Sequence, residues 1–305
     1  MPDDRDPLEP PRMEIDVEPT VASRFARWIE RGRVLRGHVE AARQEHSSID
    51  FGFGLVERDS SIGGGLLAGA LAYRLFVLLL PSALLLVSGL GIVAGTVDQS
   101  PSKIAKDAGL HGLIASEVAS AASGRHRALV FVLVLPVVAY AMFTLYSAIA
   151  KVHALAWYGS ARRVRISRRG VLVFAGAVVL QFVAVGVVGW IRRSDQFGGI
   201  AMLLVYLVLV GGAWLAVSTQ LPHREVRWFA LVPGAALFGV GLLFVNVFNV
   251  YVTTRIVENR AHTYGALGIA TALLFSLVLV GRLIVVAAEL NAALDERSRA
   301  GDRHA

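Results

Sequence analysis

The chain contains no cysteine among its 305 residues. Disulfide bonds, thiolate nucleophiles, iron–sulfur clusters and cysteine-ligated zinc are therefore excluded. Charged residues are also scarce, at 17% of the chain, whereas 55% of the residues are hydrophobic. Soluble domains have about 25% charged residues. The composition is typical of a protein that lies largely in lipid.

Six long segments of the chain carry no charged residue, and each has between 21 and 27 residues. A helix of about 20 apolar residues crosses the hydrocarbon core of a bilayer. The segments lack the period-2 alternation of a barrel strand, and a helix satisfies every backbone polar group within lipid. We therefore predict an all-α fold, a polytopic transmembrane helical bundle with six spans. The predicted spans 1 to 6 are residues 75–97, 128–150, 170–191, 196–221, 228–254 and 261–281.

Lysine and arginine are distributed unevenly among the segments that connect these spans. Of the 30 basic residues, 20 lie before span 1, between spans 2 and 3, between spans 4 and 5, and after span 6, whereas the three opposite loops hold 8. Basic residues are enriched on the cytoplasmic side of a membrane. We therefore predict that both termini of this multi-pass protein lie in the cytoplasm.

The amino-terminal region differs from the rest of the chain. Residues 1–19 are acidic and rich in proline, which predicts a disordered tail and no cleavable signal peptide. Residues 20–50 place Phe25 and Trp28 on an apolar stripe between arginines, which predicts an amphipathic cytoplasmic helix. This helix could lie on anionic membrane lipids or dock on the protein's own cytoplasmic loops. The predicted membrane domain then covers residues 51–294, and residues 295–305 form a cytoplasmic tail.

Polar residues within two spans are the candidates for a substrate path, because polar groups in lipid face a bundle interior or a wet cavity. In each set, steps of three and four residues place the side chains on one helix face. The alternative is that they join helices by hydrogen bonds, an interpretation that we favour for Gln181 in span 3. The span 2 stripe is Tyr140, Thr144, Ser147 and Lys151, and the span 5 stripe is Asn246, Asn249 and Thr253.

Two arginines lie at the edges of spans. Arg74 precedes span 1 and Arg282 follows span 6, so each could line a cavity or extend toward the lipid headgroups. Glu289 lies seven residues after Arg282, on about the same helix face. It is therefore a candidate charge partner of Arg282.

No motif of a catalytic site is present in the sequence. The eight histidines form no metal-ligand pair, and there is no nucleophile elbow, phosphate loop or dinucleotide fingerprint. The basic segments lack the features of an RNA-binding module. We therefore expect a protein that is not an enzyme, with no cofactor, no metal and no nucleic-acid partner.

Several segments resemble the YihY/BrkB family of bacterial inner-membrane proteins, over about residues 51–294. They are residues 68–74 (AGALAYR) with Pro81, 232–235 (VPGA), 250–251 (VY), 264–268 (YGALG) and 288–294 (AELNAAL). One departure is Ala287, where the family often has glycine. The resemblance implies six spans and cytoplasmic termini. Members have been labelled ribonuclease BN, but this sequence has no metal cluster or paired carboxylates with which to hydrolyse RNA.

Two classes of function are consistent with the sequence. The first is a transporter or flippase of an amphipathic, lipid-linked or anionic substrate, with the two stripes lining its path and arginines attracting a headgroup. The second is a non-transporting membrane scaffold for envelope assembly, docked through the amphipathic helix. Both have membrane lipids as partners. Because no nucleotide-binding motif is present, transport would depend on a gradient or on a partner.

Overall fold

The computed structural model describes residues 47–97, 127–162, 164–191, 199–249 and 254–302. The chain divides into two compact units, Met1–Gly54 and Leu55–Ala305. Of the first unit the structure describes only the start of helix α2. The predicted amphipathic helix at residues 20–50 therefore lies almost entirely outside the described residues.

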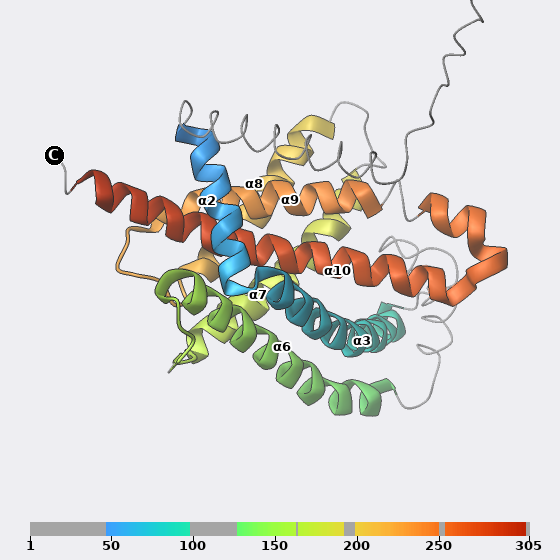
Figure 1. Cartoon of the computed structure of the whole chain (residues 1–305). Helices are drawn as coiled ribbons and strands as arrows, with labels where there is room; N and C mark the ends of the chain where they lie inside the picture. The colour runs from blue at the N-terminus through green and yellow to red at the C-terminus, as the bar shows by residue number, and fades with distance from the viewer. Residues whose placement is uncertain (1–46, 98–126, 163, 192–198, 250–253, 303–305) are drawn as a thin grey trace, which may run out of the picture. The chain divides into compact units, whose positions relative to one another are not determined.

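The described residues of the chain form helices and connections, with no strand among them, and this confirms the all-α prediction (Figure 1). The elements are α2 (Ser47–Ile62), α3 (Gly64–Val97), α6 (Arg127–Tyr158), α7 (Arg168–Ile191), α8 (Gly199–Ser218), the short 3-10 helix η1 (Trp228–Leu231), α9 (Val232–Phe248) and α10 (Thr254–Gly301). Helix α2 continues through residue 50 and α10 continues past residue 294, so two predicted domain boundaries lie within helices.

Four helices in the described part of the chain are long and apolar enough to cross a membrane. These segments are Gly64–Leu86, Ala128–Tyr158, Trp228–Phe248 and Leu273–Gly301, which overlap predicted spans 1, 2, 5 and 6. Predicted spans 3 and 4 correspond to α7 and α8, and the described apolar part of α8 is the shorter segment Leu203–Ser218.

A glycine separates α2 from α3. Gly63 has a φ of +69°, a left-handed conformation that favours glycine and ends helices. Its amide donates to the carbonyl of Ser60, and its own carbonyl accepts from Leu66 in the first turn of α3. Residues 60–97 therefore do not form one helix, whereas Pro81 lies inside α3 without ending it.

Helix α10 packs against α3, α6 and α9, and two of these contacts depend on glycine. A Cβ at Gly281 of α10 would lie 2.5 Å from the carbonyl oxygen of Ala68 in α3, and a Cβ at Gly234 of α9 would overlap the carbonyl oxygen of Ala287 in α10. Small residues allow such close approach of helix backbones in membranes. Ala287 is buried at this contact.

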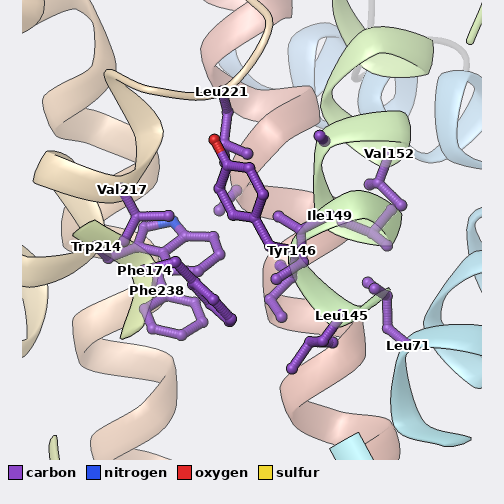
Figure 2. Packing of buried hydrophobic residues seen from close by; sticks show 14 of the residues in the cluster. Leu71, Leu145, Tyr146, Ile149, Val152, Phe174, Trp214, Val217, Leu221 and Phe238 are labelled. Atoms are coloured by element: carbon purple, nitrogen blue, oxygen red, sulfur yellow. The ribbon is translucent and has the colours of Figure 1, made fainter. Parts of the chain in front are cut away.

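Aromatic side chains fill the space between α6, α7, α8 and α9 (Figure 2). Trp214 of α8 and Phe238 of α9 stack with ring centroids 4.1 Å apart, and Tyr146 of α6 lies 5.8 Å from Phe174 of α7. The hydroxyl of Tyr146 donates to the carbonyl of Gln220, two residues after the end of α8. These contacts join the helices of predicted spans 2 to 5.

Candidate functional site

A cavity of about 250 Å³ lies in the bundle. Helices α3, α6, α7, α8, α9 and α10 all contribute side chains to its lining, and most of them are aliphatic or aromatic. Leu78 of α3, Ile149 of α6 and Leu277 of α10 are typical of this lining. Gln181 of α7 and Ser82 of α3 are its polar members. The cavity can therefore take an apolar group and offers an amide on one side.

The amide of Gln181 is part of a hydrogen-bonded cluster that connects three helices. Its Nε2 donates to the hydroxyl oxygen of Tyr206 in α8 over 2.8 Å, and Nδ2 of Asn246 in α9 donates to the same oxygen over 2.6 Å. Tyr206 is 5% exposed. The cluster agrees with the interpretation of Gln181 as a residue that joins helices, while it also borders the cavity.

The span 2 stripe does not contribute to the cavity lining. Tyr140 is 72% exposed on the outer face of α6, and Lys151 is exposed. Thr144 and Ser147 are half-buried, and the hydroxyl of Thr144 donates to the carbonyl of Ala141 in its own helix. Helical spacing brings the four residues to one side of α6, but their degrees of exposure differ.

The span 5 stripe also lies outside the cavity lining. Asn246 bonds to Tyr206 as described, and Oδ1 of Asn249 accepts a short hydrogen bond from the hydroxyl of Ser276 in α10. Thr253 lies outside the described residues. The two asparagines thus connect α9 to neighbouring helices on both sides.

Arg74 of α3 points to α6, where its Nη1 donates to the backbone carbonyl of Thr144 over 2.9 Å. Through this carbonyl Arg74 contacts the span 2 stripe, to which Thr144 belongs. The guanidinium is half-buried and does not line the cavity.

Arg282 makes an ion pair with a residue that sequence analysis did not single out. Its Nη1 and Nη2 donate to the carboxylate of Asp59 in α2, with distances of 2.8 to 3.0 Å. Asp59 is thus the direct ion-pair partner of Arg282, and the predicted partnership between Arg282 and Glu289 stays a prediction. Asp59 could have been noticed as the last carboxylate before the long uncharged segment that begins α3.

Arg58, the neighbour of Asp59, makes a second contact between α2 and the bundle. Its Nη1 lies 2.7 Å from Oε2 of Glu296 in α10, and its Nη2 donates to the carbonyl of Ala156 in α6. Glu289 lies between the two ion pairs along α10 and is only 1% exposed. We call Arg58, Asp59, Arg282, Glu289 and Glu296 the charged cluster.

Two segments that carry the family resemblance meet where α9 begins. The side chain of Asn291 is 2% exposed, and its Oδ1 accepts from the backbone amide of Gly234 over 2.8 Å. Its Nδ2 donates to the carbonyl of Leu231. An amide at the start of a helix has no partner within the helix, so Asn291 serves as a cap supplied by another helix. Neither Asn291 nor Tyr206 was among the predicted site residues.

The outer surface of the described helices is apolar on many sides. Leu66 of α3, Leu172 of α7, Val208 of α8 and Phe244 of α9 are each at least 67% exposed. Soluble monomers rarely expose apolar surface on this scale, whereas lipid requires it. Together with the long apolar helices, this surface defines the class: the protein is a multi-pass helical membrane protein.

The family model described as Virulence factor BrkB matches residues 56–305. The chain therefore belongs to this family, and the predicted resemblance is confirmed. No curated protein and no solved structure was found to match the chain.

Proposed function

We propose that the protein transports or flips an amphipathic substrate, lipid-like or anionic, and that the cavity takes an apolar segment of it. The observation that carries this proposal is the cavity of about 250 Å³ to which six helices contribute. Sites for whole drug-sized ligands have about 300–1,000 Å³. A cavity smaller than this suits part of a hydrocarbon chain, while the rest of the substrate lies elsewhere.

The proposal includes six spans, formed by α3, α6, α7, α8, α9 and α10, in a bacterial inner membrane with both termini in the cytoplasm. The charge distribution supports this topology. Reporter fusions at Arg163 and Arg299 should therefore give a cytoplasmic signal, and a fusion at Gly112 should give an external one. An internal signal at Gly112 would contradict the topology.

The proposal assigns no enzymatic activity and no nucleic-acid partner, because the sequence lacks the corresponding motifs. Membrane lipids are the partners that it requires. The driving force is a gradient or a partner protein, since the sequence has no nucleotide-binding motif.

Filling the cavity tests the function directly. Ala213 of α8 lines the cavity and Ala216, on the same helix, is exposed, so Ala213→Phe and Ala216→Phe form a matched pair. The full chain would be reconstituted in liposomes and assayed for movement of fluorescent lipids and uptake of amphipathic anions. We expect Ala213→Phe to reduce the rate at least about tenfold, equivalent to about 1.4 kcal/mol, with no comparable change in Ala216→Phe.

A membrane scaffold is the second candidate function, and one observation favours it. The asparagines of the span 5 stripe are paired with other helices, and neither stripe borders the cavity. A scaffold needs stable helix contacts and no substrate path. If the reconstituted chain moves none of the tested substrates while it retains its fold, the result supports the scaffold function and contradicts the transport function.

A further inference from the structure

The charged cluster holds three carboxyl groups and two guanidinium groups. Arg282 pairs with Asp59, and Arg58 pairs with Glu296. Both arginines are thereby occupied, and in the described part of the chain no cation forms an ion pair with Glu289. Glu289 is thus the carboxyl group without a countercharge of its own.

Glu289 is also the most deeply buried member of the charged cluster. It is 1% exposed, and its Oε1 has no hydrogen-bond partner among the described residues. A lone carboxylate in such surroundings costs so much free energy that a group of this kind is neutralised instead. Either a metal cation or a proton could neutralise Glu289.

The geometry favours a proton. Asp59, the carboxyl group held by Arg282, is the acidic side chain that interacts with the buried carboxyl group of Glu289. Two carboxyl groups form a hydrogen bond only when one of them carries a proton, because an ionised carboxylate has no donor. A hard metal cation needs several oxygen ligands, and no group of three or more His, Asp or Glu side chains converges in the described part of the chain.

We propose that Glu289 and Asp59 together hold one exchangeable proton beside Arg282, and that this proton controls the attachment of α2 to α10. When the proton leaves for water, the two neighbouring carboxylates repel each other. The ion pair of Asp59 with Arg282 then has to compete with this repulsion. Arg58 is the other charged group of α2 that acts on Glu289.

The proton site adds to the proposed function, because a proton is an ion that can couple a gradient to transport. Only this coupling rests on the proposed function, whereas the proton site itself does not. Helix α2 ends at Ile62, and Gly63 in its left-handed conformation joins it to α3, a helix that lines the cavity. Only the last residues of α2 and Gly63 therefore separate Asp59 from α3, which lines the cavity.

Infrared spectroscopy of the full chain in lipid tests the proton site without any transport assay. We expect a carboxylic acid C=O band at neutral pH that shifts in heavy water and disappears at high pH. Glu289→Gln should remove the band. Asp295→Asn should keep it, because this carboxyl group on the same helix is paired with Arg299 and lies outside the charged cluster. A band that persists unchanged in Glu289→Gln, or no band at any pH, would overturn the proposal.

A substitution that moves Asp59 without removing its carboxyl group provides a second variant. A Cβ at Gly64 would overlap Oδ1 of Asp59 and lie 3.2 Å from Nη1 of Arg282, so Gly64→Ala must displace the carboxylate. We expect the band of Glu289 to shift in frequency in this variant, as its hydrogen-bond partner moves. An unshifted band in folded Gly64→Ala would show that Asp59 does not share the proton, against the proposal.

The coupling is tested in the same liposomes by imposing a pH gradient. A gradient should accelerate substrate movement by the wild type, and Glu289→Gln should abolish the acceleration while Asp295→Asn retains it. Acceleration that survives in Glu289→Gln contradicts the coupling. A wild type that moves no substrate but shows the infrared band refutes the proposed function and leaves the proton site supported.

Discussion

In α6 the hydroxyl of Thr144 donates to a carbonyl three residues earlier in its own helix, whereas in α9 the amide of Asn246 donates to Tyr206 of another helix. The two stripes have the same spacing in the sequence. A hydroxyl reaches the backbone of the preceding turn, so threonine can be satisfied within its helix. An amide group has two donors and an acceptor, and asparagine in lipid needs a partner on another helix. Equal spacing therefore produced different structural roles.

Among the residues of the two stripes and their partners, substitution of Tyr206 should lower the free energy of unfolding most. Its oxygen accepts from both Gln181 and Asn246, so Tyr206→Phe removes two hydrogen bonds and leaves two amides without their acceptor. We expect the free energy of unfolding to fall by about 2 kcal/mol, measured by denaturant titration in detergent micelles. Tyr140→Phe is the matched control, because the exposed Tyr140 should tolerate the loss of its hydroxyl. Equal losses in the two variants would contradict the difference between the helices.

A smaller effect is expected at the contact between α9 and α10. Ser276→Ala removes the hydroxyl that donates to Oδ1 of Asn249. Hydrogen bonds between helices in membranes contribute about 0.6 kcal/mol on average and up to about 1.7 kcal/mol. We expect a loss of about 1 kcal/mol by the same titration. A double-mutant cycle with Asn249→Ala should show that the two losses are not additive, and full additivity would count against a direct bond.

The smallest effect should come from Thr144→Val. The hydroxyl bonds only to Ala141 in its own helix among the contacts described, and valine has nearly the same shape. We expect a change in the free energy of unfolding below about 0.5 kcal/mol. A loss comparable to that of Tyr206→Phe would mean that the span 2 stripe joins helices after all.

The sequence by itself determined the class of the protein and the helical fold. Uncharged segments of about 20 residues can satisfy their backbone only as helices in lipid, so the all-α prediction depended on local composition. The segments 232–235 and 288–294 could also be singled out from the sequence, because both carry the resemblance to the family. Their physical connection, in which Asn291 caps the helix that contains Gly234, was not visible in either segment alone.

The tertiary structure alone decided which polar groups meet. Asp59 and Arg282 are 223 residues apart, and Gln181 meets Asn246 only through Tyr206 of a third helix. Helical spacing fixes the face on which a side chain lies, but not which helix packs against that face. Spacing along α10 suggested Glu289 as a charge partner of Arg282, but it could not show that Asp59 of α2 makes the direct ion pair with this arginine. Partner choice depends on how helices pack, which the free energy of the whole bundle determines.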